Sequence, residues 1–537
     1  MSHELRPFTT VAELVQWSCD HFADVEALVD RRADGQELRM SFTALGERID
    51  GATRAVIGSG VGRGDRVGIW APNIWEWVVA SLGVLSAGGV VVPINTRFKG
   101  AEAAYVLERA QARLLFTVTD FLDLDRVALL RDASPVPSLE QIVVMRGEAP
   151  TGTVGWDAFL ARGDEVDDAV VSAARAAITP QDLSLVMFTS GTTGMPKGAM
   201  LEHGALLRGF TDWSEIIGLR RGDRYLIVNP FFHMFGLGAG FLACLMVGAT
   251  IVPHPVFDVS QVMARVVEER ITVLPGPPAI YQTILNHPDL ASFDFSTVRL
   301  AATGAASIPV ELIVAMRDVL GFETVVTGYG LTEGTGLATM CRAGDDPKTI
   351  ATTSGRAMPD MEVVAVDDDG RALAPGEQGE IWVRGYNVMR GYLDDPEQTA
   401  EAVDVDGWLH TGDIGVLDER GYIQITDRKK DMFIVGGFNA YPAEIESILG
   451  GHPGIAQVAV VGVPDQRLGE VGVAFVVPVT GAQPEPDQII AWSREVMANY
   501  KVPRQVHLVD ALPLNASNKV LKFELRERAN RLIPSGE

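Results

Sequence analysis

The sequence predicts an α/β protein, with a large N-terminal part built on a mostly parallel sheet and a small α+β part after it. Helical and strand patterns alternate from residue 12 to residue 327, and the strands are apolar almost throughout. After residue 353 the pattern changes to antiparallel β-strands. A cluster of charges at 427–431, with the sequence DRKKD, separates this β-rich stretch from the rest of the chain.

The N-terminal part opens with two helical patterns and then alternates between strands and helices. Apolar residues at helical spacing predict the helices, and short apolar runs bounded by turn residues predict the strands. Strands without polar alternation are typical of a sheet covered on both faces. The predicted helices cover 12–22, 41–57 and 75–87, and the predicted strands cover 66–70, 89–94, 115–117, 184–188, 225–229, 250–253, 273–274 and 324–327.

The uncharged stretch 236–253 is long enough to raise the question of a membrane span. It contains many small residues, however, and it stops at the sequence Pro253-His254-Pro255. These two features favour a buried helix followed by a strand over a segment that crosses a membrane.

The part after residue 353 is predicted as hairpins followed by a small α+β unit. The turn 367–370, with the sequence DDDG, lacks the spacing of a calcium-binding loop, so we interpret it as a hairpin turn. We place the domain boundary in the charge cluster, which gives an N-terminal domain of residues 1–428 and a C-terminal domain of residues 429–537. The predicted strands cover 362–366, 380–383, 458–463 and 473–477, and the predicted helices cover 444–449 and 486–497.

The composition fits an enzyme that acts without nucleic acid or a membrane. The chain has 45 Lys and Arg and 70 Asp and Glu, which gives a net charge of −25, whereas a nucleic-acid-binding protein needs a basic surface. The three cysteines are far apart and form no C-x-x-C motif, which argues against disulfides and a zinc site. The first residues lack the apolar stretch of a signal peptide. We therefore expect a cytoplasmic protein.

Ten consecutive residues, 189–198, have the sequence TSGTTGMPKG. Glycines let the backbone approach an anion closely, hydroxyls and turn N–H groups donate hydrogen bonds, and Lys197 supplies positive charge. The order differs from that of the P-loop, because a proline precedes the lysine and a glycine follows it. We interpret the segment as a polyphosphate-binding loop, with a polar surface loop as the alternative.

Four further clusters carry residues suited to a nucleotide. The sequence YGLTE at 329–333 follows an apolar strand and offers a carboxylate for Mg²⁺ and a hydroxyl for a phosphate. The sequence TGD at 411–413 offers a carboxylate for ribose hydroxyls, and Arg428 could reach the same sugar. Lys519 lies near the C-terminal end in the sequence NASNK. Each residue alone is explained as well by a helix cap or a solvated charge, so the prediction depends on their combination.

In this order, the motifs resemble those of the AMP-forming acyl-CoA synthetases of the adenylate-forming superfamily. The TSGTTGMPKG, YGLTE, TGD and DRKKD segments and the terminal lysine all match, so the resemblance covers the chain essentially end to end. It implies a large N-terminal domain of α/β subdomains and a small, mobile α+β C-terminal domain. It implies a carboxylic acid as substrate, with ATP, Mg²⁺ and CoA as cofactors, and it leaves a homodimer open.

The first half of the family's reaction forms an acyl-adenylate. A carboxylate oxygen attacks the α-phosphorus of ATP and expels pyrophosphate, a step that depends on positioning and charge neutralisation. The resemblance implies that Thr332 contacts the α-phosphate, that Glu333 ligates Mg²⁺, and that Lys519 bridges the two reacting groups. The residues implied in binding ATP or AMP are Thr189, Ser190, Gly191, Thr192, Thr193, Gly194, Lys197, Gly304, Ala305, Ala306, Tyr329, Gly330, Asp413 and Arg428.

The second half transfers the acyl group to CoA. The resemblance implies that the small domain rotates about a hinge at Lys430, which moves Lys519 away from the nucleotide. The segment of Gly436, Gly437 and Phe438 would then bind CoA, because its glycines would let the pantetheine arm approach the backbone. The family usually has a glycine before the terminal lysine, where this chain has Asn518.

The acyl pocket is also carried over from the resemblance. His233 matches a histidine that lies beside the acyl chain and gates the pocket in relatives; a buried core histidine is the alternative. Thr327 replaces a Gln or Asn that is frequent there. The pocket residues are Phe232, His233, Gly276, Pro278, Thr327 and Gly328.

The sequence indicates the class of reaction more clearly than the identity of the acid. Segments such as NPFFHMFG and GVPDQRLGEVG look most like those of actinobacterial CoA ligases of steroid catabolism, which activate a bicyclic propanoate. A medium-chain fatty acid or an aromatic acid is the competing hypothesis. Two other functions stay open at this stage: an adenylating enzyme that loads a carrier protein or an amine, and a catalytically silent scaffold.

Overall fold

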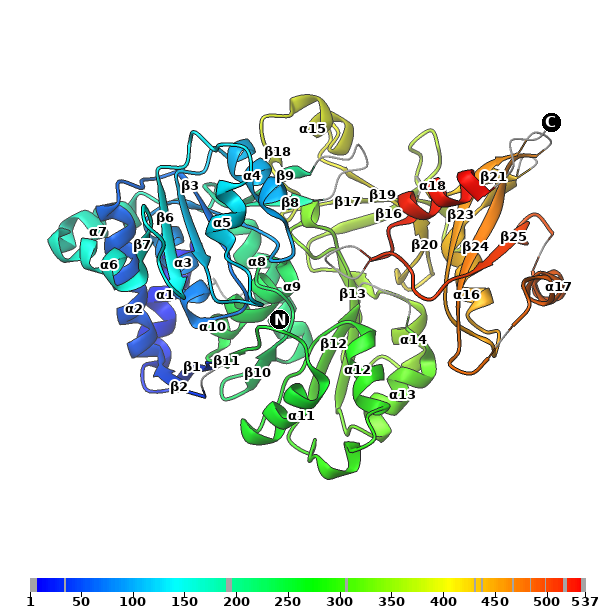
Figure 1. Cartoon of the computed structure of the whole chain (residues 1–537), viewed down its shortest axis with the longest axis horizontal. Helices are drawn as coiled ribbons and strands as arrows, with labels where there is room; N and C mark the ends of the chain where they lie inside the picture. Colours follow the sequence, from blue (N-terminus) through cyan, green and yellow to red (C-terminus); the bar gives the residue numbers. More distant parts are fainter. Residues whose placement is uncertain are drawn as a thin grey trace. The chain divides into compact units, whose positions relative to one another are not determined.

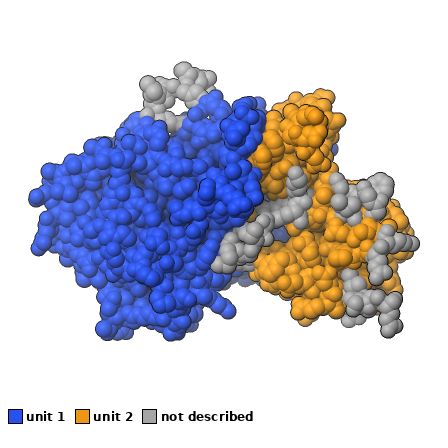
Figure 2. Space-filling model, turned by 90° about the horizontal axis from the view of Figure 1, so that it is seen from above, with its two compact units in different colours: residues 1–363, 383–409 blue, residues 364–382, 410–537 orange. Residues whose placement is uncertain are grey.

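The computed structural model describes residues 7–32, 35–189, 196–304, 308–428, 431–435, 438–465, 468–482, 484–497, 499–514 and 519–532. The chain packs into two compact units, coloured separately in Figure 2. Unit 1 comprises residues 1–363 and 383–409, and unit 2 comprises residues 364–382 and 410–537. These units reflect packing and need not coincide with the domains, so the boundary between residues 428 and 429 stays a prediction.

An eight-stranded sheet forms the larger core of unit 1 (Figure 1). Its central strands are parallel, as the apolar runs predicted, and the hairpin of β8 and β9 adds antiparallel pairing at one edge. The order is β18 (Gly391–Tyr392), β9 (Lys197–Glu202), β8 (Leu183–Thr189), β4 (Val90–Pro93), β3 (Arg66–Trp70), β5 (Leu114–Val118), β6 (Gln141–Arg146) and β7 (Val154–Gly155).

Helices α3 (Trp75–Ser86) and α4 (Gly100–Arg109) connect neighbouring strands of this sheet. The chain runs from β3 to β4 on one side and then passes back across β3 to β5. Because such crossovers are right-handed, the two helices must cover opposite faces. Every residue of α3 is buried, and α4 packs on the sheet through an apolar cluster that includes Leu107 and Val92.

Two four-stranded groups form the second β region of unit 1. Val273 makes a parallel bridge to Tyr225 in one group and to Leu300 in the other, so it joins them. The strand predicted at 273–274 is therefore a single bridging position. The groups are β10 (Arg224–Ile227), β11 (Thr250–Pro253), β1 (Glu26–Arg31) and β2 (Glu37–Ser41), and β12 (Leu300–Gly304), β13 (Thr324–Tyr329), β14 (Thr339–Met340) and β15 (Arg356–Ala357).

The apolar stretch 236–253 forms a π-helix at Leu237–Leu242, then α10 (Ala243–Val247) and β11. The π-helix and β11 are buried throughout, so the predicted buried helix and strand are confirmed. The π-turn was not predicted. Within the described ranges, no helix has the length and apolar character needed to cross a membrane.

Unit 2 contains most of a four-stranded sheet and a five-stranded sheet whose strand pairs are antiparallel except for one parallel pair. The predicted DDDG turn is confirmed, with the Asp367 N–H donating to the Arg371 oxygen at 2.9 Å and Gly370 at φ +77°. The strands are β16 (Glu362–Val366), β17 (Gln378–Arg384), β19 (Leu409–Leu417) and β20 (Ile423–Arg428), and β22 (Phe438–Ala440), β21 (Phe433–Val435), β24 (Gly469–Pro478) and β23 (Ile455–Asp465), with β25 (Gln505–Leu508) paired to β24.

Several of the remaining helices begin at a capping side chain or at a proline. In α1, for example, Thr10 and Glu13 form a capping box. The remaining helices are α1 (Val11–Phe22), α2 (Phe42–Gly58), α5 (Arg126–Arg131), α6 (Trp156–Leu160), α7 (Asp168–Ala176), α8 (His203–Ile217), α9 (Met234–Gly236), α11 (Val259–Glu268), α12 (Pro278–Leu285), α13 (Val310–Asp318), α14 (Pro347–Thr352), α15 (Pro396–Ala402), α16 (Pro442–Leu449), α17 (Pro486–Val496) and α18 (Lys522–Leu532). Short 3₁₀ turns lie at Ala161–Glu165, Leu290–Ser292 and Thr332–Gly334.

Candidate functional site

The two ends of the phosphate-binding segment lie opposite each other in unit 1. Thr189 is the last residue of β8 and Lys197 the first of β9, and the two are register partners in the antiparallel pair. The intervening residues Ser190, Gly191, Thr192, Thr193 and Gly194 lie outside the described part of the chain. The structure thus fixes where the predicted loop leaves and re-enters the sheet.

Glu333 lies beside the start of this loop. The Thr189 hydroxyl donates to Glu333 Oε1 at 3.2 Å, although 144 residues separate the two in sequence. The Tyr392 hydroxyl donates to the same oxygen at 2.8 Å. Glu333 and Thr332 belong to the 3₁₀ turn that follows β13, and the backbone oxygen of Glu333 accepts from the Met389 N–H at 2.7 Å. The fold thus joins the phosphate segment and the YGLTE segment.

Lys197 is half-buried and has two partners. Its ammonium donates to Gln398 Oε1, and it lies 5.2 Å from the centre of the Tyr392 ring. These three side chains line a cavity of about 550 Å³, together with Tyr105, Arg109, Pro196, Gly198, Leu393, Asp395 and Glu397. The cavity is therefore lined by the lysine that the sequence predicts to bind phosphate.

The segments predicted to hold adenine also meet. Strands β12 and β13 are parallel, with Gly304 opposite Gly328 and Thr303 opposite Thr327. A Cβ on Gly304 would lie 3.1 Å from the Gly328 oxygen, so a side chain there would crowd the neighbouring strand. Tyr329, which ends β13, is half-buried, and Gly330 is exposed. Ala305 and Ala306 lie outside the described residues.

The predicted ribose-binding residues lie in unit 2. Asp413 on β19 and Arg428 on β20 are register partners, and Asp413 is 5% exposed. Gly412 adopts φ +68°, and its N–H donates to Glu380 Oε1 at 3.1 Å, which explains the glycine of the TGD segment. Lys519 is exposed, and Phe438 begins β22. Lys430, Gly436 and Gly437 lie outside the described residues.

The predicted acyl-pocket residues come from several segments of unit 1. His233 is exposed and caps α9 by accepting a hydrogen bond at Nδ1 from the Phe235 N–H at 3.2 Å, so the alternative of a buried core histidine is wrong. Phe232 is half-buried, whereas Thr327 is 3% exposed. The Gly276 N–H donates to the Ala302 oxygen at 3.0 Å, and Pro278 begins α12. Their role in a common pocket stays a prediction.

The chain also matches known proteins along its length. The pattern of the AMP-binding enzyme family matches residues 15–393, and that of the AMP-binding enzyme C-terminal domain matches residues 444–519. The chain belongs to the AMP-binding enzyme family. It is an ATP-using acid–thiol ligase, an AMP-forming acyl-CoA synthetase. The class of enzyme that the sequence motifs predict is therefore confirmed.

Two relatives and one solved structure show how far the similarity extends. The chain is 49% identical to 3-[(3aS,4S,7aS)-7a-methyl-1,5-dioxo-octahydro-1H-inden-4-yl]propanoyl:CoA ligase of Rhodococcus jostii, over 97% of this chain and 98% of the relative. It is 50% identical to the protein of that name from Mycobacterium tuberculosis, over 92% and 94%. ATP-bound MatB from Rhodopseudomonas palustris is 29% identical, with a TM-score of 0.84 over 97% and 99% of the two chains.

Glu333 is the candidate ligand for the magnesium ion that the sequence predicts. Among the described residues, no three His, Cys, Asp or Glu side chains gather as a metal site. Mg²⁺ commonly uses one or two protein carboxylates and takes its other ligands from water and substrate phosphates. The Glu333 carboxylate beside the phosphate segment therefore fits Mg²⁺ bound together with ATP, and the described residues offer no cluster of three such ligands that would hold a metal without substrate.

Sequence reasoning missed two residues of this site, Tyr392 and Gln398. Both contact Lys197, yet they follow it by about 200 residues and lie in a short strand and the first turn of α15. The only local signal is Asp395, which caps α15 by accepting from the Gln398 N–H at 3.1 Å. That signal predicts a helix start and carries no information about the phosphate segment.

Proposed function

We propose that this AMP-binding enzyme activates a bicyclic, steroid-derived propanoic acid as its CoA thioester. The observation that carries the proposal is the identity of 49% and 50% to two ligases named for the methyl-dioxo-octahydroindenyl propanoyl group, over more than nine-tenths of the chain. The proposal agrees with the steroid-catabolism segments found in the sequence. It leaves medium-chain and aromatic acids as the alternatives to be tested.

In the proposed first half-reaction, the residues of unit 1 hold the triphosphate. Lys197 would offset the charge of the outer phosphates, the hydroxyls of the segment that starts at Thr189 would donate hydrogen bonds to them, and Thr332 would contact the α-phosphate. Glu333 would ligate Mg²⁺, which supplies charge neutralisation on the phosphate oxygens. Tyr329 and the segment after Gly304 would enclose adenine.

Residues of unit 2 would complete the first half. Asp413 and Arg428 would bind ribose, and Lys519 would offset the charge of both the substrate carboxylate and the α-phosphate, which otherwise repel each other. Attack of the carboxylate oxygen on the α-phosphorus expels pyrophosphate and leaves the acyl-adenylate.

In the proposed second half-reaction, rotation about Lys430 replaces Lys519 by the segment of Gly436, Gly437 and Phe438. The CoA thiolate then attacks the acyl carbonyl, the bond to AMP breaks, and AMP leaves. His233, which is exposed at the start of α9, would gate the acyl pocket in this proposal.

The test is a pyrophosphate-release screen with ATP, Mg²⁺ and CoA present. The panel contains the bicyclic propanoate, medium-chain fatty acids from C6 to C12, and aryl acids such as ferulate. We expect kcat/KM for the bicyclic acid to exceed that of every other acid by about 100-fold, the scale on which a fitted apolar pocket discriminates. A fatty or aryl acid with equal or higher kcat/KM would refute the assignment of the acid while leaving the ligase class intact.

A further inference from the structure

Tyr392 connects the two charged side chains on which nucleotide binding is proposed to depend. Its hydroxyl donates to Glu333 Oε1 at 2.8 Å. The face of its ring carries the Lys197 ammonium 5.2 Å from the ring centre. One side chain therefore contacts the candidate metal ligand with its polar end and the candidate phosphate ligand with its ring.

The hydroxyl of Tyr392 acts as a donor at neutral pH. An ionised carboxylate can only accept a hydrogen bond, so the phenol is the donor in its bond to Glu333 Oε1. The Thr189 hydroxyl donates to the same carboxylate oxygen at 3.2 Å. Since both bonds end on Oε1, they hold this oxygen and leave Oε2 outside this pair.

The backbone of Tyr392 is held from two sides. Strand β18 pairs with β9, with Tyr392 opposite Ala199, and Figure 1 shows the two short strands side by side below α15. The Tyr392 N–H donates to Thr399 Oγ1 at 2.8 Å in the first turns of α15. A Cβ on the preceding Gly391 would lie 2.7 Å from Thr399 Cγ2, so the approach of strand and helix is close. The backbone that carries the ring is thus fixed by strand pairing and by a contact with α15.

Lys197 and Glu333 do not form an ion pair with each other among the described residues. The ammonium is held instead by Gln398 Oε1 and by the Tyr392 ring. A direct pair would satisfy both charges and compete with the phosphate and the metal for them. The position of the aromatic ring gives each charge a partner that is weaker than an ion pair.

We propose that Tyr392 is a positioning residue for the adenylation step: it orients the Glu333 carboxylate for Mg²⁺ and keeps Lys197 from pairing with it. This inference rests on the proposed role of Glu333 as the metal ligand. It adds Tyr392 to the site. The contribution of Tyr392 should be seen in the magnesium dependence of ATP binding.

The test measures ATP binding by calorimetry over a series of free Mg²⁺ concentrations, without any acid. We expect Tyr392→Phe to raise the Mg²⁺ concentration for half-maximal enhancement of ATP binding by about tenfold, the effect of losing one hydrogen bond to a charged group. In EDTA, Tyr392→Phe should bind ATP like the wild type, because the ring remains. Tyr392→Leu should in addition weaken ATP binding in EDTA, because Lys197 is then no longer kept from pairing with Glu333.

Tyr386 provides a matched control in the same unit. Its hydroxyl donates to Asp212 Oδ2 at 3.0 Å, and the Arg208 guanidinium lies 4.0 Å from its ring centre, so it has the same pair of contacts with a different carboxylate and cation. We expect Tyr386→Phe to leave the Mg²⁺ dependence unchanged. Thermal unfolding of both variants measures any structural loss.

The outcomes separate this inference from the function on which it rests. If Glu333→Gln removes the Mg²⁺ enhancement and Tyr392→Phe does not alter it, the inference about Tyr392 is wrong and the metal role stands. If Glu333→Gln leaves the enhancement intact, both are wrong. Equal shifts in Tyr392→Phe and Tyr386→Phe would also overturn the inference, because they would indicate a general loss of structure. None of these results depends on which acid the enzyme uses.

Discussion

His203 is an ionisable residue buried in unit 1, 1% exposed, at the start of α8. Its Nδ1 accepts a hydrogen bond from the Val11 N–H at 3.2 Å, which ties the first residue of α1 to the β9–α8 junction. Among the described residues, its Nε2 has no hydrogen-bond partner. Burial therefore lowers the pKa of His203 to about 4.

This pKa predicts a loss of stability in mild acid. An unfolded histidine binds a proton below about pH 6.5, whereas folded His203 stays neutral down to about pH 4, so the unfolded state binds more protons between these values. Stability should therefore fall as the pH falls, by about 2 kcal/mol between pH 6.5 and 5 from this residue alone. Thermal unfolding of His203→Gln should show a shallower pH dependence than the wild type.

Glutamine is the appropriate replacement at His203, because its side-chain oxygen can still accept from the Val11 N–H while the titrating group is removed. His21→Gln serves as the control, since His21 is exposed and stacks on Trp17 with ring centres 4.9 Å apart. Parallel curves for wild type and His203→Gln over this pH range would show that His203 does not govern the effect.

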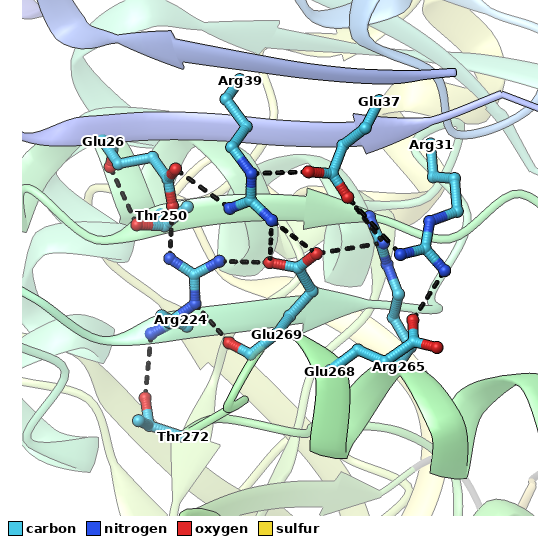
Figure 3. Close-up of polar contacts among 10 residues, drawn as sticks. All are labelled: Glu26, Arg31, Glu37, Arg39, Arg224, Thr250, Arg265, Glu268, Glu269 and Thr272. Atoms are coloured by element: carbon cyan, nitrogen blue, oxygen red, sulfur yellow. Dashed lines mark hydrogen bonds and ion pairs between the residues drawn. The ribbon is translucent and has the colours of Figure 1, made fainter. Parts of the chain in front are cut away.

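At the scale of elements, an ion-pair network ties the β1–β2 hairpin to β10 and to the end of α11 (Figure 3). Glu269 lies at its centre with a side chain 2% exposed. It accepts from Arg39 at 3.0 Å on both oxygens, from Arg224 at 2.6 Å, and from Arg265 at 3.2 Å. β2 is the edge strand of its group, so it has a neighbouring strand on one side only. The bonds of the network give this edge further contacts that strand pairing does not supply.

Removing the central charge should destabilise this region strongly. Glu269→Gln leaves three neighbouring guanidinium groups with less negative charge in a partly buried place, and we expect a loss of about 3 kcal/mol in the free energy of unfolding. The measurement is chemical denaturation of the whole chain.

The neighbouring residue gives the control for this prediction. Glu268 pairs with Arg31 at 2.6 Å, but its side chain is 45% exposed. Glu268→Gln should therefore cost less than about 1 kcal/mol, as exposed pairs generally do. Similar losses for the two variants would mean that burial of Glu269 does not set the strength of the network.

At the scale of the whole molecule, the proposed nucleotide-binding residues are divided between the two compact units. Thr189, Lys197 and Glu333 belong to unit 1, whereas Asp413 and Lys519 belong to unit 2. Under the proposed rotation about Lys430, one half-reaction would lose the contribution of Lys519, which the other does not need.

We therefore expect Lys519→Ala to slow adenylation by at least about 100-fold, because a charge that stabilises the transition state is lost. Thioester formation from supplied acyl-adenylate should change less than about threefold, since Lys519 is proposed to be displaced in that step. ATP–pyrophosphate exchange measures the first half, and CoA-dependent release of AMP from acyl-adenylate measures the second.

Lys522→Ala is the matched control for this variant. It removes a cation three residues away that pairs with Glu446 at 2.9 Å, and it should leave both rates within about twofold. Equal loss of both half-reactions in Lys519→Ala would contradict a role confined to adenylation.

The strands and helices with strong local patterns could be predicted from the sequence. The strand at 66–70 and the strand at 250–253 have the predicted bounds, and the helix at 12–22 differs by one residue. The hairpin of β1 and β2 was missed, because the apolar run of β1 is only Ala27-Leu28-Val29 and because β2 carries the charged residues Glu37 and Arg39. Its stability comes instead from pairing with β11 and from distant arginines and glutamates.

The sequence by itself determined the class of chemistry. The phosphate segment, Glu333, Asp413 and Lys519 are recognisable because the residue types that bind phosphate, metal and ribose occur in a fixed order along the chain. Only the tertiary structure decided that Tyr392 stands between Glu333 and Lys197, and that His233 is exposed. Sequence patterns report local preference and order, whereas a contact across 200 residues depends on strand order and register, which no local pattern contains.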